Sequence, residues 1–526
     1  MSPNQRLMVA VGLSIIFFVV YTAIFPPKEN LDTKNPNNTV ALKDAKTQQV
    51  SSTTTTSADN TPSSVAKTAS NNIVTVKADD FILTIDTLGR IASKELLQEK
   101  YNTKDNKHAQ MIQTFATKPL FIRFMDEDLN KEAKKTPYSA DVQTVTLTKG
   151  EAKKVTLTQK LSELTVTKEL TFYDDGHYDA TVKLSKEKRY FIYLGERPKV
   201  NETEQMMAAV GALIYTNDDI LTIIEDGEME GRKTFTGVQL IASFDQYTAS
   251  IMYGFKKDTT ILVERDADNN PLVYFDALPT MSFHGYIGPK NYDILKSIDP
   301  ILVNAIEYGW FTFAAKPLFA LLSYLHGIFG NWGWSIIALT IIIRLILYPL
   351  TYKGMVSMQK MKAISPKIKE IQAKYKGDPQ RMNAAVMEMY KKHGANPLGG
   401  CLPMLLQIPV FFAIYRVLLN AEELQGAPWI LWINDLSRMD PYFVLPILMG
   451  ASMYFQQRMT PNNFTDPLQA KVFKFLPIIF TFFFMTFPSG LVLYWFVNNL
   501  FSMLQQFIVN QQFKNKEDLE KAIKNK

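Results

Sequence analysis

Residues 336–352 read IIALTIIIRLILYPLTY, an apolar stretch with a single charged residue, Arg344, near its middle. A helix needs about 20 mostly apolar residues to cross a bilayer, and this stretch with its apolar flank reaches that length. An arginine at the centre of a spanning helix costs about 2.5–3.5 kcal/mol on insertion scales, so its presence calls for a function. The stretch therefore predicts a membrane protein and makes Arg344 the first candidate functional residue.

Other stretches of the 526-residue chain also carry no charged side chain, and they cover residues 7–27, 394–415, 441–457 and 475–513. The last is long enough for two spanning helices. With the Arg344 stretch they predict a polytopic α-helical membrane protein with six spans. Residues 7–25 have the length of a signal peptide, but no small-x-small cleavage site follows them, which favours an uncleaved anchor.

The charges in two connecting segments predict the orientation of the spans. Residues 352–398 carry ten Lys and Arg against three acids, whereas residues 420–441 carry one against four. Short loops rich in Lys and Arg stay in the cytoplasm, so the first segment is predicted to lie inside and the second outside. Counting spans from these loops places both chain termini in the cytoplasm and residues 28–330 outside.

The region between the first two spans changes composition at residue 73. Residues 28–72 are polar and rich in Ser, Thr and Asn, which predicts a flexible linker. From Ile73 onward apolar and polar residues alternate, and the turn pairs Lys149-Gly150 and Asp175-Gly176 predict hairpins. Residues 73–290 are therefore predicted to form an antiparallel β-sandwich. No catalytic carboxylate pair or histidine cluster is evident in it.

Residues 291–330 are apolar but are interrupted by charged side chains such as Asp299, Glu307 and Lys316. These interruptions favour an amphipathic helix that lies in the outer membrane interface. A seventh span at residues 313–330 remains an alternative, and it would reverse the orientation of every loop that follows.

The segment 353–398 has helical character on both sides of Gly377-Asp378-Pro379, which interrupts it. This pattern predicts a helical hairpin. Apolar residues recur at a spacing of three or four on its first arm, namely Met355, Met358, Met361, Ile364, Ile368 and Ile371. The stripe fits either internal packing of the two arms or an adaptable, methionine-rich surface for partners.

Arg344 has no obvious partner, because none of the predicted span cores contains Asp or Glu. A water-containing cavity inside the bundle therefore becomes the favoured explanation. Polar residues of other spans that could line it are Gln407, Gln456, Asn498, Asn499, Ser502 and Gln505. Each one alone is better explained by hydrogen bonding between helices. Together they predict a positively charged cavity that attracts carboxylates transiently.

Four segments carry a family resemblance: GNWGWSIIALTIIIRLILYPLTYKGMVSMQKMKAISPKIKEI, YKKHGANPLGGCLPMLLQIPVFFAIYRVL, DPYFVLPILMGASMYFQQRM and FPSGLVLYWFVNNL. They span most of residues 330–510. In these segments the chain resembles the YidC-type membrane protein insertases of bacteria with an outer membrane. The resemblance implies a non-enzymatic insertase and chaperone of the inner membrane, with a groove open to cytoplasm and lipid and a periplasmic β-supersandwich.

The resemblance completes a domain map of the chain. It comprises an anchor at 1–27, the linker at 28–72, the periplasmic domain at 73–290, the interfacial helix at 291–330, the second span at 331–352, the cytoplasmic hairpin at 353–398, four further spans at 399–510 and a basic cytoplasmic tail at 511–526. Five spans, all but the first, are expected to form the insertase core.

The family's groove residues fall on particular positions of this sequence. The groove arginine matches Arg344, and the contact residues match Thr340, Gln407, Tyr494 and Trp495. Many relatives have a second tyrosine where this chain has Trp495, which keeps the aromatic surface and one donor but lacks the acceptor hydroxyl. The further polar residues expected to line the groove are Asn498, Asn499 and Ser502. Another unusual charge, Arg416, is expected to reach outward to water.

The implied partners are newly made membrane proteins as substrates, the Sec translocon, the ribosome, the signal recognition particle receptor and membrane lipids, but not DNA. No cofactor is expected. The single cysteine, Cys401, excludes an internal disulfide and a multi-cysteine metal site. The main alternative is a solute or anion transporter that uses Arg344, but no internal repeat and no intramembrane acid support it.

Overall fold

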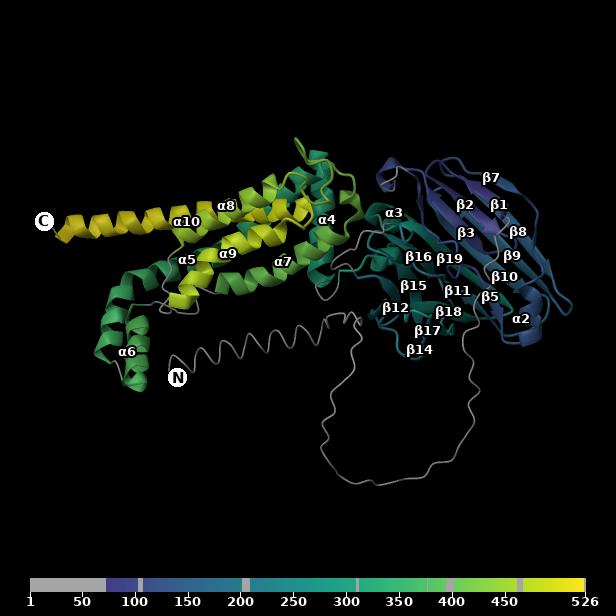
Figure 1. Cartoon of the computed structure of the whole chain (residues 1–526), viewed down its shortest axis with the longest axis horizontal. Helices are drawn as coiled ribbons and strands as arrows, with labels where there is room; N and C mark the ends of the chain where they lie inside the picture. The colour runs from purple at the N-terminus through teal and green to yellow at the C-terminus, as the bar shows by residue number, and fades with distance from the viewer. Residues whose placement is uncertain are drawn as a thin grey trace, which may run out of the picture. The chain divides into compact units, whose positions relative to one another are not determined.

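The computed structural model describes residues 72–102, 107–200, 209–308, 312–375, 377–393, 402–460 and 467–524. The predicted anchor at 1–27 and nearly all of the predicted linker at 28–72 lie outside these residues. The described chain consists of a β domain followed by a series of helices (Figure 1).

The described residues of the β domain form three sheets. One has the order β4-β3-β2-β1-β7, with β1 Asn72–Lys77, β2 Phe81–Asp86, β3 Ile91–Leu96, β4 Ala109–Gln110 and β7 Thr144–Thr146. The largest has the order β13-β12-β15-β16-β19-β10-β9-β8-β6, with β6 Ser139–Ala140, β8 Ala152–Lys160, β9 Thr165–Tyr173, β10 His177–Leu184, β12 Gly211–Thr216, β13 Leu221–Glu225, β15 Val238–Phe244, β16 Thr248–Tyr253 and β19 Thr280–Pro289. The third has the order β14-β17-β18-β11-β5, with β5 Ile122–Phe124, β11 Tyr190–Tyr193, β14 Lys233–Phe235, β17 Ile261–Arg265 and β18 Pro271–Ala277. Two short helices, η1 (Glu99–Tyr101) and α2 (Glu127–Ala133), connect strands.

Alternation of apolar and polar residues explains the core of this domain. In β9, buried and half-buried residues alternate along the whole strand, so that one face enters the core and the other faces outward. Phe81 and Phe172 lie in the core cluster, which draws side chains from all three sheets. The described strand pairs are antiparallel except for β1 and β7, which run parallel.

One of the two predicted hairpins is confirmed and the other is wrong. β9 and β10 pair across Asp175-Gly176, and Gly176 has a φ of +91°, which glycine adopts without strain. At Lys149-Gly150, however, β7 joins β1 in one sheet while β8 joins β9 in another. Alternation predicts that two strands exist, but not which sheet each strand enters.

A further series of helices follows the β domain. They are α3 (Tyr292–Ile298), η2 (Pro300–Ala305), α4 (Thr312–Phe329), α5 (Trp332–Lys374), α6 (Pro379–Lys392), α7 (Leu402–Asn420), η4 (Glu422–Leu424), α8 (Val444–Met459), α9 (Pro467–Phe484) and α10 (Ser489–Lys524). The segment predicted as one interfacial helix at 291–330 is thus divided into α3, η2 and α4.

Within the described residues, three helical segments have the length and apolar composition to cross a membrane: α4, α5 and residues Ser489–Lys514 of α10. Shorter apolar helical segments occur at Gln407–Asn420 and Phe473–Phe484. These segments are compatible with the six predicted spans, the first of which lies outside the described residues. The length of α4 keeps the alternative of a further span open.

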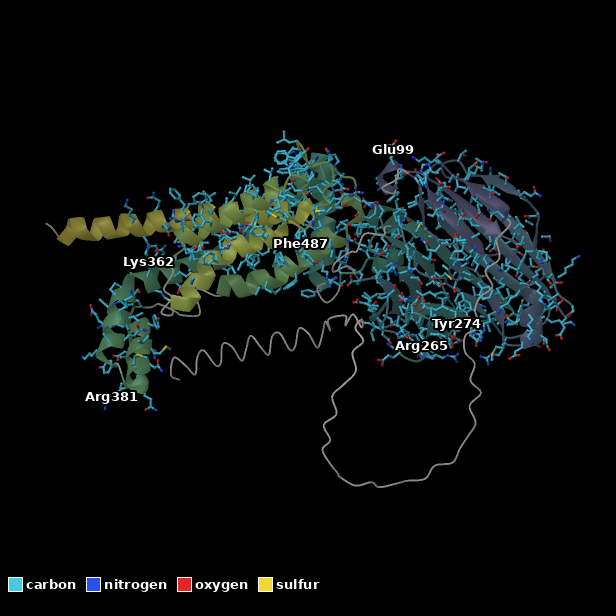
Figure 2. All side chains as sticks on the ribbon, in the orientation of Figure 1. Glu99, Arg265, Tyr274, Lys362, Arg381 and Phe487 are labelled. Atoms are coloured by element: carbon cyan, nitrogen blue, oxygen red, sulfur yellow. The ribbon has the colours of Figure 1, made fainter. Side chains whose placement is uncertain are left out.

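The predicted cytoplasmic hairpin forms a unit of its own. α5 continues past residue 352 to Lys374, and the interruption predicted at Gly377-Asp378-Pro379 lies between α5 and α6. Asp378 caps α6, because its side chain accepts a hydrogen bond from the backbone nitrogen of Arg381 at 3.1 Å. Lys362 lies on the α5 arm and Arg381 on α6 (Figure 2).

The loop at residues 421–443 holds the start of α10. The backbone nitrogen of Ser489 donates to the carbonyl oxygen of Arg438 at 2.7 Å, and its hydroxyl donates to the same oxygen at 2.8 Å. The backbone nitrogen of Gly490 donates to the carbonyl of Leu436 at 2.9 Å. Donors at a helix start have no partner within the helix, so this loop satisfies two of them.

Close packing of α8 on α9 depends on Gly450. A Cβ at this position would lie 1.8 Å from Thr481 Oγ1 and 3.1 Å from Thr481 Cβ, so rotating the hydroxyl alone would not make room. We expect Gly450→Ala to separate the two helices and to cost about 1–3 kcal/mol, as overpacking does. The measurement is the thermal unfolding midpoint of the purified protein in detergent.

Gly327→Ala on α4 is the matched control for this substitution. A Cβ at Gly327 would meet no atom within 4 Å, and alanine favours helix over glycine by about 1 kcal/mol. We expect its midpoint to equal or exceed that of the unsubstituted protein. Equal midpoints for the two alanine variants would contradict the close-packing role of Gly450.

Candidate functional site

The guanidinium of Arg344 lies on α5 inside the helical bundle, and only 6% of the residue is exposed. Nε donates a hydrogen bond to Asn498 Oδ1 on α10 at 2.5 Å, and Nη2 donates to the backbone oxygen of the same residue at 3.3 Å. Both acceptors are neutral. They compensate part of the desolvation of the guanidinium without cancelling its charge.

A small, partly open cavity lies beside Arg344, where α5, α7 and α10 meet. Its lining residues are Thr340, Ile343, Arg344, Leu347 and Thr351 from α5, Gln407 and Val410 from α7, and Tyr494 and Asn498 from α10. The α5 residues recur at a spacing of three or four, which places them on one face of the helix. The cavity therefore has a wall of mixed polar and apolar side chains around one cation.

The structure brings four of the five predicted groove residues to this cavity, namely Arg344, Thr340, Gln407 and Tyr494. Thr340 is buried, and its hydroxyl donates to the carbonyl oxygen of Ile336 at 2.7 Å. That bond uses the only hydroxyl proton, so toward the cavity Thr340 can act as an acceptor.

Trp495 is not among the residues that line the cavity. Its ring packs edge-on against Phe411 and at a tilt against Phe484, with ring centroids 4.6 Å and 5.1 Å apart. The side chain thus belongs to an aromatic cluster between α7, α9 and α10. This position supports the bundle next to Tyr494 and does not face the cavity.

The three further polar residues of α10 differ in their contacts. Asn498 lines the cavity, whereas Asn499 donates to the hydroxyl of Ser452 on α8 at 3.1 Å. The hydroxyl of Ser502 donates back to the carbonyl oxygen of Asn498 at 2.9 Å. Sequence reasoning missed Thr351, although its helical spacing from Arg344 on the same face was a usable signal.

Two family models match the chain, the YidC periplasmic domain over residues 73–321 and the 60Kd inner membrane protein over residues 324–517. A membrane protein insertase YidC of Campylobacter jejuni is 46% identical over 97% of this chain and 96% of its own length. The chain belongs to the YidC family of membrane protein insertases.

Other relatives carry the same name and also match this chain over nearly its whole length. A membrane protein insertase YidC of Wolinella succinogenes is 47% identical over 98% of this chain and 96% of its own length. One of Helicobacter pylori is 45% identical over 98% of this chain and 97% of its own length. A crystal structure titled as an active YidC insertase with the first transmembrane domain resolved is 20% identical, with a TM-score of 0.35 over 83% of this chain and 94% of that chain.

Membership in the YidC family establishes the general function. The chain is a multi-pass membrane protein insertase of the inner membrane with a large, β-rich periplasmic domain, and it is not an enzyme.

Arg416, near the end of α7, keeps 20% of its side chain exposed and also has a carboxylate partner, and its expected reach outward to water stays a prediction. Its Nη1 lies 3.6 Å from Glu307 Oε2, and Glu307 is buried. The Asn420 side chain donates to the backbone oxygen of Glu307 at 2.6 Å and holds this segment in place. Arg416 and Arg344 therefore differ, because Arg416 has a carboxylate partner while the hydrogen bonds of Arg344 go to neutral groups.

A buried carboxylate connects the YidC periplasmic domain to the helices. Glu422 is fully buried and accepts hydrogen bonds from Lys100 Nζ at 2.6 Å, from the Tyr101 hydroxyl and from Asn291 Nδ2 at 3.0 Å. Lys100 and Tyr101 belong to η1 of the periplasmic domain, and Asn291 caps α3. Sequence reasoning missed this cluster, because its members lie up to 322 residues apart.

The neighbouring carboxyl group of Glu423 has a different character. Its Oε1 accepts a hydrogen bond from the backbone nitrogen of Tyr292 at 2.6 Å. Burial, together with the adjacent Glu422 carboxylate, raises the pKa of Glu423 to about 8. Near neutral pH, Glu423 is therefore mostly protonated.

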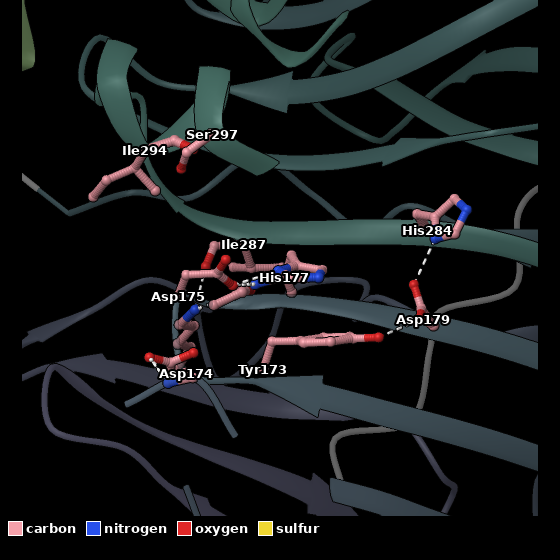
Figure 3. A network of polar contacts seen from close by, with 12 residues as sticks. Tyr173, Asp174, Asp175, His177, Asp179, His284, Ile287, Ile294 and Ser297 are labelled. Atoms are coloured by element: carbon pink, nitrogen blue, oxygen red, sulfur yellow. Dashed lines mark hydrogen bonds and ion pairs between the residues drawn. The ribbon is translucent and has the colours of Figure 1, made fainter. Parts of the chain in front are cut away.

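Figure 3 shows a polar network on the largest sheet of the periplasmic domain. The Tyr173 hydroxyl donates to Asp179 Oδ2 at 2.8 Å, Asp179 Oδ1 bonds His284 Nδ1 at 2.5 Å, and His177 bonds Asp175. Among the described residues, no group of three His, Cys, Asp or Glu side chains is arranged to hold a metal ion. The network fits cross-strand stabilisation of β9, β10 and β19.

Proposed function

We propose that this insertase draws the acidic or polar tail of a newly made client protein into the cavity beside Arg344. The observation that carries the proposal is the buried guanidinium, whose hydrogen bonds go to neutral acceptors of Asn498. A carboxylate on the client tail would supply the counter-charge that neither acceptor provides. Charge-assisted hydrogen bonds of this kind are stronger than neutral ones.

The proposal also explains how the apolar part of a client reaches lipid. A charged tail cannot enter hydrocarbon alone, because desolvation is too costly without a partner. While the tail lies in the cavity, the client's apolar helix can pass along the exposed apolar side chains of α5 and α9. These include Leu345, Ile346, Ile479 and Phe482.

Within this mechanism we assign Thr340, Gln407 and Tyr494 to client contact, because all three line the cavity with Arg344. The hydroxyl of Tyr494 and the amide of Gln407 offer donors to a polar tail, and Thr340 offers an acceptor. Trp495 supports the position of Tyr494 from the aromatic cluster.

We further propose the orientation that the loop charges predict, with both termini cytoplasmic, residues 28–330 periplasmic and the domain boundaries of the sequence map. The contact of Glu422 with Lys100 supports it, because Lys100 lies in the periplasmic domain and Glu422 in the 421–443 loop. This loop then lies outside, and the basic segments 353–398 and 511–526 lie inside.

The proposed partners follow from the same orientation. Exposed cations of the hairpin, such as Lys362 and Arg381, would meet the ribosome, the signal recognition particle receptor or anionic lipid headgroups. We also propose that the insertase works both alone and with the Sec translocon.

Proteoliposomes that contain only this protein test the function. Two single-span clients are compared, one with an acidic N-terminal tail and one in which Asn and Gln replace the Asp and Glu of that tail. We define the tail ratio as the protease-protected fraction of the acidic tail divided by that of the neutral tail. We expect a wild-type tail ratio of about ten or more, because a charge-assisted hydrogen bond contributes about 1.5–3 kcal/mol.

A control with empty liposomes corrects both clients for spontaneous insertion. A tail ratio of one would contradict the role of charge attraction. Uptake of a small organic anion driven by an ion gradient would instead favour the transporter alternative.

A further inference from the structure

Both hydrogen bonds described for the Arg344 guanidinium go to the same residue, Asn498. Asn498 offers its side-chain oxygen to Nε and its backbone oxygen to Nη2. A guanidinium has five N–H donors in a fixed planar arrangement. The two bonds use two of them, which leaves both donors of Nη1 and one donor of Nη2 for another acceptor.

We propose that Asn498 is a positioning residue for the insertase. Its neutral amide fixes the plane of the Arg344 guanidinium against α10, keeps the charge uncancelled and leaves the remaining donors to a client carboxylate. This inference rests on the proposed function, because it assigns to Asn498 the orientation of the group that attracts the client tail.

The placement of Asn498 supports this role. It is 4% exposed, so water does not compete freely for its oxygen. Tyr494 precedes it by one helical turn and lines the same cavity, so the two side chains lie on one face of α10. A client carboxylate bound to the free donors of Arg344 would therefore meet Tyr494 next to it.

An asparagine fits this position better than an aspartate would. Aspartate has nearly the same shape, but it would form a charge-assisted, bidentate pair with the guanidinium. That internal pair would occupy donors needed by the client and cancel the positive charge of the cavity. The change from amide to carboxylate therefore keeps the orientation of the Arg344 guanidinium but cancels the positive charge of the cavity, so the two effects can be separated.

The neighbouring residue Asn499 offers a matched control. It is as buried as Asn498, but its amide donates to Ser452 on α8 and not to Arg344. Asn499→Asp places the same carboxylate one residue further along α10, on a side that faces another helix. Any general cost of burying a carboxylate in the bundle should appear in both aspartate variants.

The experiment measures the tail ratio in proteoliposomes that contain the full chain. We expect Asn498→Asp to lower the tail ratio to about one, as Arg344→Ala does, whereas Asn499→Asp keeps the wild-type ratio. Asn498→Ser removes the side-chain oxygen that holds Nε but keeps the backbone acceptor. We expect it to lower the tail ratio roughly threefold, in line with the loss of one hydrogen bond, and Asn499→Ser to leave it unchanged.

The outcomes separate this inference from the function on which it rests. If Arg344→Ala keeps the wild-type tail ratio, the proposed use of Arg344 is wrong. If Arg344→Ala loses the ratio while Asn498→Asp and Asn498→Ser both keep it, only the positioning role of Asn498 is wrong. If Asn498→Asp fails to accumulate in the membrane, the comparison of Asn498→Ser with Asn499→Ser decides alone. An unchanged tail ratio in Asn498→Ser then overturns the inference.

Discussion

Arg344→Ala is expected to lower insertion of the acidic-tailed client by about tenfold or more, because it removes the charge that compensates the desolvated tail carboxylate. A hydrogen bond to a charged group contributes about 1.5–3 kcal/mol, and each 1.36 kcal/mol corresponds to a factor of ten. Arg344→Lys should retain more activity than the alanine variant, because an ammonium group keeps the charge although it loses the planar arrangement of donors. The measurement is the protease-protected fraction of the client tail in proteoliposomes.

Two comparisons make this result specific to the cavity. Insertion of the neutral-tailed client should change much less in Arg344→Ala than insertion of the acidic one. Arg438→Ala removes an exposed arginine from the 421–443 loop and should insert both clients like the wild type. An equal loss in the lysine and alanine variants would show that the guanidinium acts through its bidentate geometry and not mainly through its charge.

Glu422→Ala is expected to weaken the junction between the periplasmic domain and the helices by about 2–4 kcal/mol. The substitution removes the shared acceptor of Tyr101 and Asn291, and a buried donor left without a partner costs about 1–3 kcal/mol. The ion pair with Lys100 adds less, because a third of that side chain is exposed to solvent. The measurements are the thermal unfolding midpoint and amide hydrogen exchange at η1 and α3, which should become faster.

Substitution of the neighbouring Glu423 provides the control for this prediction, and its effect should depend on pH. Because the pKa of Glu423 is raised to about 8 in the folded protein, the folded state binds a proton that the unfolded state releases above its ordinary pKa. The contribution of Glu423 to stability is therefore present at low pH and is lost as the pH rises through about 8. Relative to wild type, Glu423→Gln should leave the midpoint nearly unchanged at about pH 4, raise it at pH 6 and raise it further at pH 9. A fall as large as that of Glu422→Ala at pH 6 would contradict this assignment.

The sequence was sufficient to predict the residues that share a helix face with Arg344. Thr340 precedes Arg344 by four residues, so helical geometry alone brings the two side chains to one surface. The apolar context around Arg344 was also local information, and it indicated a buried charge. These parts of the site depend only on residues close together in the chain.

The partner of Arg344 depends on tertiary structure. Asn498 and Asn499 are adjacent and identical in type, and only the packing of α10 decides that one faces the cavity while the other faces Ser452. The same reason applies to Trp495, which the family resemblance assigns to the groove: adjacent helical residues point about 100° apart, and Trp495 packs against Phe411 and Phe484 while Tyr494 lines the cavity. The turn at Lys149-Gly150 has a similar origin, because sheet membership is set by long-range pairing.

The attachment of α10 at one end has a consequence for how the membrane stays sealed. Ser489 and Gly490 are tied to the 421–443 loop, the same loop that Glu422 joins to the periplasmic domain. Nine residues further along, Asn498 has no such backbone tie to that loop, and at about 1.5 Å per residue it lies roughly 13 Å deeper. If a client widens the proposed groove, we expect α10 to tilt about this attached end, because the loop holds it there. The end of α10 next to the loop would then stay packed during insertion, which would limit the leakage of ions across the membrane.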